Sequence, residues 1–311
     1  MIRGRYRIID LLARGGMGEV FRAQCVDTGE PVVIKTLLPA LHERRDLVAL
    51  FIEEAELTAR LRHQRIVRVF DYGRGDDCCC FMVMEQLEGE TLGALMRQAY
   101  EELSGLPVPV VLAVGIQLCQ ALEHGAHARG QNGAPLALVH RDLSPLNVFV
   151  TERGGVKLLD FGIALATGVS RHRASPSLRG KPSYRSPEMV RSLPVDARSD
   201  LFTLGIILWE ALAGRKLFCS QPQDESERRI LTMPIPPITR VLPEAPPELD
   251  AILDKALARD PKLRFQTAGE FGQALQRLFR ALCGTARQHQ VLIGALQHMR
   301  GRSVGGEAES A

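Results

Sequence analysis

Apolar and polar positions follow two different patterns along the chain. Runs rich in β-branched and aromatic residues, separated by glycines or by the turn sequence DTGE, predict strands over 6–13, 19–26 and 31–37. Two further runs, IVRVFDYG and CCFMVMEQL, predict another pair of strands joined by the polar turn RGDD. Between these two groups, the apolar residues over roughly 43–62 have the spacing of a helix.

From about residue 90 the periodicity is helical, and helices are expected at 91–102, 109–129, 198–213, 249–258 and 267–283. The pattern therefore predicts an α+β protein in which a small β-rich lobe precedes a larger helical lobe. The expected divisions are 1–86, 87–284 and a tail over 285–311. The tail carries one short amphipathic run, Val291 to Met299, and then a Gly-, Ser- and Glu-containing end that is expected to be disordered.

Composition and charge restrict the class of function. Hydrophobic residues make up 45% of the chain and charged residues 24%, as in an ordinary globular protein. The formal net charge of +3 is too small to predict binding to nucleic acid or to an anionic membrane. The apolar run LFTLGIILWEALAG (201–214) is too short for a bilayer span and contains Glu210, so it predicts a buried helix.

Cysteine usage and the N-terminus point to a reducing compartment. Three of the seven cysteines are consecutive, Cys78, Cys79 and Cys80, and no CxxC pair occurs. Neighbouring residues of a strand point to opposite faces, so reduced thiols are favoured over a zinc site. The N-terminus, MIRGRYRIIDLL, has no long apolar segment and no small-residue cleavage site. We therefore expect a cytoplasmic protein. The proline-rich stretch at 234–250 favours a rigid loop between helices, with a PxxP ligand as the alternative.

A glycine-rich sequence, LLARGGMGEV (11–20), lies between the first two predicted strands. Glycines allow a backbone to approach phosphate oxygens and to offer amide donors to them. A dinucleotide-binding loop also uses spaced glycines, but it opens into a helix, whereas Val20 and Phe21 begin a strand here. A Walker-type loop would need GK[ST], which is absent from this stretch.

Lys35 ends the apolar strand VVIK, which is ordinarily a solvated position. The alternative is a lysine that neutralises phosphates and needs a carboxylate to hold it. The helix that follows offers one, because at ~100° per residue Glu54 falls near the middle of the apolar stripe. That stripe comprises Leu47, Leu50, Phe51, Leu57 and Leu61. A carboxylate on a buried face is costly unless it is paired, and Lys35 is its natural partner.

In this order and spacing, the motifs of the chain resemble those of bacterial-type (eukaryotic-like) serine/threonine protein kinases over about 5–283. The matching stretches are ARGGMGEV, VVIK, FIEEA, HRDLSPLN, DFG (160–162), SPE (186–188), SDLFTLGIILWE (199–210) and RDPKLRF (259–265). The resemblance implies a bilobal protein-kinase-like fold with ATP bound by the small lobe. It also implies ATP and Mg²⁺ (or Mn²⁺) as cofactors and proteins as substrates. A homodimer is common in the family, although no residue of this sequence points to one.

The resemblance assigns a role to each matching residue. Asp142 is similar to the aspartate that orients the substrate hydroxyl and accepts its proton. Asn147 and Asp160 match the two metal-binding positions, and both offer oxygen ligands, which suits Mg²⁺. Lys35 and Glu54 match the ion pair that positions ATP. Two further matches are structural: Asp200 is expected to hold the catalytic loop from behind, and Glu188 to pair with Arg264.

The nucleotide pocket follows from the same resemblance. Met84 is expected to be the gatekeeper residue of this pocket. The backbone of Glu85 and Leu87 is expected to hydrogen-bond to adenine. The ring is expected to lie between Leu12, Val20, Val33 and Phe149, with Lys35 on the phosphates. The glycine loop contributes Ala13, Arg14, Gly15, Gly16 and Gly18.

Three positions depart from the family pattern. Ala13 replaces the first glycine of the loop, which is expected to alter nucleotide affinity without abolishing binding. Ser144 stands where the family has a lysine beside the γ-phosphate, and Lys181 stands where it has a threonine that contacts that lysine. The two side chains are therefore expected to be exchanged, with Lys181 supplying the ammonium and Ser144 the hydroxyl. The alternative is a simple loss at Ser144, with Lys181 as one more basic residue of the segment.

The substrate class and regulation follow from the same segments. The sequence SPL (144–146) favours serine and threonine over tyrosine, since similar tyrosine kinases carry AAR or RAA there. Arg141 precedes Asp142, as in kinases that read a phosphate on the activation segment. Ser175 or Ser177 is the expected site of autophosphorylation. The rival functions are a pseudokinase scaffold, for which Ser144 and Ala13 are the support, and a small-molecule kinase, which SPE and the GK..Y segment disfavour.

Overall fold

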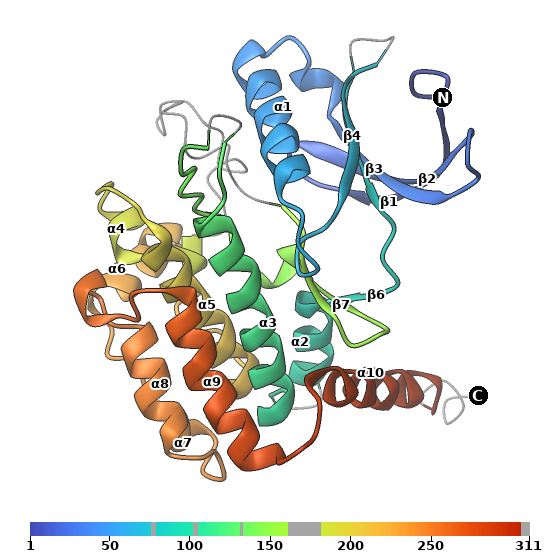
Figure 1. The fold of residues 1–311 in the computed structure, drawn as a ribbon. Coiled ribbons are helices and arrows are strands. Elements are labelled where there is room, and N and C mark those ends of the chain that lie inside the picture. The colour runs from blue at the N-terminus through green and yellow to red at the C-terminus, as the bar shows by residue number, and fades with distance from the viewer. Residues whose placement is uncertain (76–78, 102–104, 131–132, 161–181, 306–311) are drawn as a thin grey trace. The chain divides into compact units, whose positions relative to one another are not determined.

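The structure, a computed structural model, describes residues 1–75, 79–101, 105–130, 133–160 and 182–305. The chain divides into two compact units. Unit 1 comprises Met1–Leu87 with Asp160–Gly180, and unit 2 comprises Glu88–Leu159 with Lys181–Ala311. Unit 1 is built on a sheet and unit 2 is mainly helical, so the predicted α+β class is confirmed (Figure 1).

Unit 1 contains all five strands expected from the β-rich runs and turn sequences. They are β1 (Tyr6–Arg14), β2 (Gly18–Cys25), β3 (Pro31–Leu37), β4 (Val69–Arg74) and β5 (Cys80–Glu85). They form an antiparallel sheet in the order β1-β2-β3-β5-β4. The predicted helix is α1 (Arg45–Arg60), which packs against β4 and β5. Asp46 lies in its first turn and Arg60 in its last, as the helix dipole favours.

One buried apolar cluster of unit 1 lies on one face of this sheet. Its members are Ile2, Tyr6, Ala23, Cys25, Val32, Ile34, Phe81 and Val83. Cys80 is fully buried in β5, so this thiol packs in the interior as an apolar group, as expected for a strand residue. Cys78, the first cysteine of the triplet, lies outside the described residues.

Unit 2 begins with a small sheet that the sequence did not predict. Its strands are β6 (Gly89–Thr91), β7 (Val148–Thr151) and β8 (Val156–Leu158), in the order β6-β7-β8. Each strand has only three or four residues, which is too short for an alternating pattern to appear. The register places Thr91 opposite Phe149, so the strand after the catalytic loop is paired with the strand that begins unit 2.

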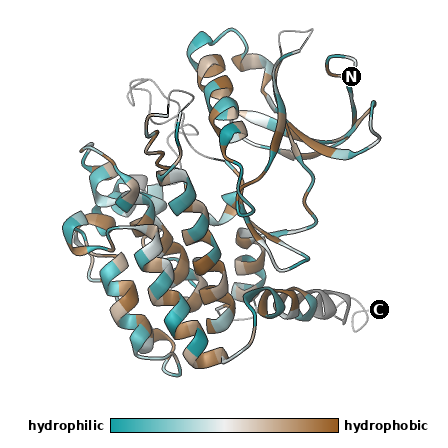
Figure 2. Ribbon diagram, in the orientation of Figure 1, coloured by the Kyte–Doolittle hydropathy of each residue, from teal (hydrophilic) through white to brown (hydrophobic). Residues whose placement is uncertain are grey.

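Five helices of unit 2 are those that the periodicity predicted. They are α2 (Leu92–Glu101), α3 (Val108–Ala126), α5 (Ala197–Ala213), α8 (Glu248–Ala256) and α9 (Ala268–Cys283). The helices α4 (Pro187–Val190), α6 (Gln223–Thr232) and α7 (Ile238–Val241) were not predicted, and α7 interrupts the proline-rich stretch expected to be a loop. Figure 2 shows hydrophilic and hydrophobic residues on α8 and α9, as for helices with one face in a core.

The helices α3 and α5 lie in the interior of unit 2. Among the described residues, α3 is the single helix long and apolar enough to cross a membrane, but 72% of its apolar window is buried within the protein. Helix α5 begins at Asp196, whose side chain accepts the Arg198 amide, and ends at Gly214 in the left-handed conformation. Glu210 near its end is completely buried.

A further helix of unit 2, α10 (Gln288–Gly305), continues past the amphipathic run seen in the sequence. It packs against α3 with Leu292 and Leu296 buried. The Gln98 side chain of α2 donates to the Met299 carbonyl over 3.0 Å. Gly154, at the β7–β8 turn, has φ +72°, and a Cβ there would lie 2.2 Å from the His289 carbonyl oxygen. A side chain at position 154 would strain the left-handed backbone and would also collide with α10. Glycine is therefore required for both reasons.

Candidate active site

Lys35 lies in β3 and forms an ion pair with two carboxylates of unit 1. Its Nζ is 3.2 Å from Glu54 Oε1 and 3.0 Å from Asp160 Oδ2. Burial alone would lower the pKa of Lys35, but Asp160 and Glu54 outweigh it and raise the pKa above its usual value. The ammonium is therefore charged throughout the physiological pH range. The structure brings together the pair that helical periodicity indicated, and it adds Asp160 as a second partner.

The two elements position this pair by their own periodicities. On β3, Ile34 and Thr36 are buried on one face, so Lys35 points to the other. On α1, Glu54 lies between Phe51 and Ala55, both buried. The carboxylate is therefore held within the buried face of α1, where the Lys35 ammonium neutralises it.

The glycine loop is a tight connection between β1 and β2. The Gly15 amide donates to the Gly18 carbonyl over 2.8 Å. A Cβ on Gly18 would lie 2.3 Å from the Thr36 carbonyl oxygen of β3, so glycine is required there by close approach of the backbones. Arg14 donates to Glu19 over 2.7 Å and so ties the two ends of the loop together. Gly16 is the remaining glycine of this turn.

The expected adenine-binding residues are divided between the two units. In unit 1, Ala13 is paired with Val20 and Val33 with Met84 in the sheet register, and Met84 is buried. Exposed Leu12 lies on β1, and Leu87 is the last residue of the first segment. In unit 2, half-buried Phe149 lies on β7. The Glu85 amide donates to the Arg68 carbonyl, so the Glu85 carbonyl is the backbone group it can offer to a nucleotide.

The catalytic-loop candidates lie together in unit 2. The Asn147 Nδ2 atom donates to the Asp142 carbonyl over 2.8 Å and to Asp142 Oδ2 over 3.2 Å. These two bonds use the nitrogen, so the Asn147 Oδ1 atom is the one suited to a metal. Among the described residues no group of three His, Cys, Asp or Glu side chains lies close enough to hold a metal. An oxygen-only donor set such as Asn147 and Asp160 is the kind that Mg²⁺ accepts.

Asp200 holds the backbone just before Asp142. Its carboxylate accepts the His140 amide over 2.7 Å and the Arg141 amide over 3.0 Å. Burial raises the pKa of Asp200 to about 7, while these two amides and Arg141 act in the opposite direction. Arg141 has φ +63°, a conformation that costs a non-glycine residue roughly 1–2 kcal/mol. The two hydrogen bonds therefore maintain a strained turn, as expected for Asp200. His140 is completely buried.

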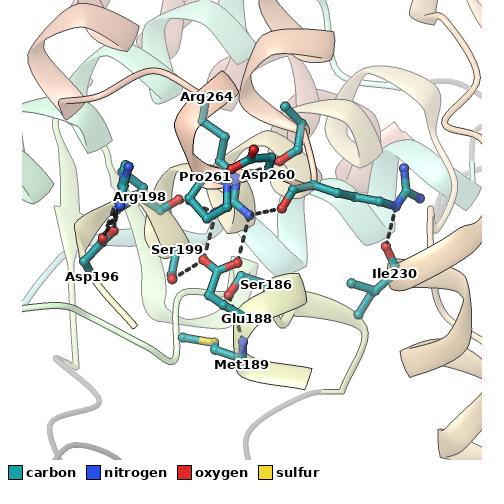
Figure 3. Close-up of polar contacts among 12 residues, drawn as sticks. Ser186, Glu188, Met189, Asp196, Arg198, Ser199, Ile230, Asp260, Pro261 and Arg264 are labelled. Carbon is teal, nitrogen blue, oxygen red and sulfur yellow. Dashed lines mark hydrogen bonds and ion pairs between the residues drawn. The ribbon is translucent and has the colours of Figure 1, made fainter. Parts of the chain in front are cut away.

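Glu188 and Arg264 form the second expected ion pair (Figure 3). Two 2.8 Å hydrogen bonds join the guanidinium to both carboxylate oxygens, and Ser199 donates to Glu188 as well. Arg264 also donates to the carbonyls of Ala258, Arg198 and Arg259. Burial would raise the pKa of Glu188, but donation from Arg264 and Ser199 lowers it overall.

Of the two residues expected to be exchanged, the structure describes Ser144 but not Lys181. Ser144 is 3% exposed and precedes the 3₁₀ turn Pro145–Asn147. Lys181 lies outside the described residues, and so do the activation-segment serines Ser175 and Ser177. The proposed relocation of the ammonium therefore remains a prediction.

Sequence reasoning missed a polar cluster around Glu210. The Tyr184 hydroxyl donates to Glu210 Oε2 over 2.6 Å, and Lys216 Nζ lies 2.9 Å from the same oxygen. Lys216 also contacts the Tyr184 hydroxyl at 2.6 Å, and the Leu217 amide donates to Glu210 Oε1 over 3.0 Å. Burial, and then Glu210, raise the pKa of Tyr184, so the phenol stays a donor. The sequence held the signal, because a carboxylate inside the apolar run 201–214 requires a partner.

Comparison with known proteins gives consistent results. The family model described as protein kinase domain matches residues 6–279. The chain is 37% identical over 276 residues to the tyrosine-protein kinase MasK of Myxococcus xanthus, covering 88% of this chain and 43% of that protein. It is also 37% identical over 273 residues to the probable serine/threonine-protein kinase SCO3848 of Streptomyces coelicolor, covering 86% of this chain and 39% of that protein. The chain thus spans less than half the length of these two relatives.

The solved structures that match are of the same kind. The kinase domain of Mycobacterium tuberculosis PknI superposes with a TM-score of 0.66 at 28% sequence identity. The match covers 89% of this chain and 96% of that structure. It therefore includes both units, whose sheet and helices were described above.

Proposed function

Because the chain belongs to the protein kinase family, we propose that it transfers the γ-phosphoryl group of ATP to serine and threonine hydroxyls of proteins. The observation that carries the proposal is the Lys35 ammonium, which two carboxylates hold at hydrogen-bonding distance in unit 1. An ammonium fixed in this way can neutralise phosphate oxygens without any rearrangement. We also propose that the whole protein acts on protein substrates and is located in the cytoplasm.

Each proposed role corresponds to a described position. Asp142 accepts the proton of the substrate hydroxyl, and its carboxylate is oriented by the Asn147 side chain. Asn147 and Asp160 would hold Mg²⁺ through oxygen atoms, and that ion supplies charge neutralisation at the phosphates when bound. Asp200 keeps the backbone of the loop in place through two amides. Retention of this set argues against a pseudokinase scaffold.

For the acceptor residue there are two alternatives, serine or threonine on the one hand and tyrosine on the other. The relative from Myxococcus xanthus is named a tyrosine kinase, whereas the relative from Streptomyces coelicolor is named a serine/threonine kinase. The sequence SPL at 144–146 supports serine and threonine. Incubation with radiolabelled ATP and a basic protein, followed by acid hydrolysis, separates the three phosphoamino acids.

The matched control in that assay is Asp142→Asn. We expect phosphoserine and phosphothreonine from the unaltered chain and a loss of ~10²-fold or more in the variant, because the general base is removed. Detection of phosphotyrosine alone would show that the acceptor is tyrosine and not serine or threonine. Label that is unchanged in Asp142→Asn would contradict the proposed mechanism altogether.

The exchange of Lys181 and Ser144 has its own test. Lys181→Met is expected to reduce phosphoryl transfer ~10²-fold while leaving ATP affinity unchanged, since a cation at the transferring group acts mainly in the transition state. The double variant Ser144→Lys with Lys181→Thr restores the usual family arrangement and is expected to retain substantial activity. A nearly silent Lys181→Met would show that Lys181 is an ordinary basic residue.

Regulation is proposed to use the activation segment. Autophosphorylation of Ser175 or Ser177 would give Arg141 an anionic partner. Mass spectrometry of protein incubated with Mg-ATP should find phosphate between 163 and 183, and its absence there would exclude this mechanism. Size-exclusion chromatography tests the homodimer that the family resemblance implies.

A further inference from the structure

A buried acidic group lies beside the turn Pro182–Tyr184. This turn belongs to the stretch GKPSY (180–184), here called the docking segment because the family resemblance implies that protein substrates dock on it. Glu210 is 0% exposed and lies on α5. Tyr184, which hydrogen-bonds to it, belongs to the short turn Pro182–Tyr184 that ends the activation segment. The Tyr184 carbonyl in turn accepts the Thr203 hydroxyl of α5 over 2.9 Å. The Glu210 carboxylate therefore contacts the docking segment directly.

The cation that neutralises Glu210 comes from the surface. The Lys216 side chain is 45% exposed, although its Nζ lies 2.9 Å from Glu210 Oε2. The same ammonium lies 5.1 Å from the centre of the Tyr184 ring and 6.0 Å from that of Tyr100. The ammonium thus occupies a site made of the Glu210 carboxylate, the Tyr184 hydroxyl and the Tyr100 ring, which it enters from solvent. A carboxylate, a hydroxyl and an aromatic ring are also groups to which an alkylammonium or guanidinium group of another chain binds.

The other acidic groups that contact this segment have the same kind of partner. Arg185 pairs with Glu227 of α6 at 2.7 Å, and Glu188 pairs with Arg264. Between 161 and 181 the sequence contains Arg171, Arg173, Arg179 and Lys181 but no aspartate or glutamate. Lys216 differs from Arg264 in being nearly half exposed, so it alone of these two partners can be replaced from outside.

We propose that Lys216 is a specificity-determining residue, which supplies from within the chain the cation that the Glu210 carboxylate would otherwise take from a basic side chain of the protein substrate. The unaltered kinase is then indifferent to a basic residue at the substrate position that faces Glu210. Removing the Lys216 ammonium opens the site and creates a preference for arginine or lysine there. This inference rests on the proposed function, because it assumes that substrates dock on the segment containing Tyr184.

The test compares peptide substrates in which arginine replaces alanine at one position at a time around the acceptor serine. The unaltered kinase is expected to give a kcat/KM ratio near one at the position that faces Glu210. Lys216→Met is expected to raise that ratio ~10-fold at this one position, as for ~1.4 kcal/mol of added binding. Lys216→Arg, which keeps the cation, is expected to retain the original profile.

The matched control is Arg215→Met, which removes the same charge one residue earlier. Arg215 is exposed and its guanidinium lies over the Trp209 ring, away from Glu210. Its arginine profile is expected to equal that of the unaltered kinase. An active Lys216→Met variant with the unaltered profile, or the same gain in Arg215→Met, would overturn the proposal.

A second measurement decides the matter if Lys216→Met is too weakly folded or too inactive for peptide assays. Propylammonium replaces the atoms that Lys216→Ala removes, so it is expected to raise the melting temperature of that variant and not of the unaltered chain. Sodium chloride at equal ionic strength is the control. If the melting temperature of Lys216→Ala is the same in the two salts, the proposed cation site is wrong. If the unaltered chain phosphorylates no serine or threonine peptide, the proposed function fails, while the thermal measurement still tests the site.

Discussion

Two buried ion pairs of this protein use the same chemistry for different ends. In unit 1, one ammonium is shared by two carboxylates, and the side chains remain 20% (Lys35), 12% (Glu54) and 31% (Asp160) exposed. In unit 2, Arg264 is completely buried, and the structure gives it bonds to Glu188 and to three backbone carbonyls. The first cluster is open to a ligand and the second is saturated. A group poised for chemistry thus keeps access to solvent, whereas a structural pair uses all its donors internally.

The largest effect is expected at the saturated pair. Arg264→Met leaves the Glu188 carboxylate buried without its cation, which typically costs ~3–5 kcal/mol of folding stability. Urea unfolding followed through Trp209, the single tryptophan and a buried residue of unit 2, measures this loss. Adding Glu188→Leu should recover part of it, because no unpaired charge then remains. A loss below 1 kcal/mol would show that the pair is not structural.

The open pair is expected to respond in rate. Lys35→Met should lower kcat ~10²-fold or more, since the cation at the phosphates is lost. Its folding stability should fall less than that of Arg264→Met, because Glu54 and Asp160 are accessible to water. Steady-state kinetics and thermal unfolding of the same preparation separate the two effects. Equal losses of stability in both variants would remove the distinction between the clusters.

Acid should weaken the saturated pair. The pKa of Glu188 is lowered in the folded state, so its stabilisation is fully present above its unfolded value of 4.5 and is lost as pH falls below that value. The slope is at most ~1.4 kcal/mol per pH unit for one proton. The stability difference between the unaltered chain and Glu188→Gln should be constant from pH 7 to 5 and shrink below 4.5. A difference that persists to pH 3 would exclude this linkage.

The smallest effect is expected at a pair that resembles the structural one only in its distance. Arg198 and Asp196 are adjacent in Figure 3 but are 28% and 55% exposed. Solvent screening limits such a pair to ~1 kcal/mol or less. Arg198→Met should therefore leave the urea midpoint almost unchanged in the assay used for Arg264→Met. A loss comparable to that of Arg264→Met would mean that burial is not the deciding variable.

Much of this arrangement follows from local patterns. Runs rich in β-branched and aromatic residues, bounded by glycines and turn sequences, located all five strands of unit 1. The 3.6-residue period located α1 and placed Glu54 near the centre of its apolar stripe. The chain positions of the catalytic-loop residues were also clear, because turn and motif residues lie within a few positions of each other. The short strands β6 to β8 were missed, since three or four residues carry too little periodicity to be recognised.

The sequence by itself determined the order of strands and helices, the family and the pairing of Lys35 with Glu54, because each depends on residues a few positions apart or on one helical face. The tertiary structure alone decided that Asp160 shares Lys35, that Lys216 neutralises Glu210 beside Tyr184, and that α10 packs onto α3 and against Gly154. Apart from Lys216 and Glu210, which are six positions apart, these contacts join residues tens or more than a hundred positions apart in the chain. Periodicity carries no information about them, since it records which face of an element is buried and not what covers that face.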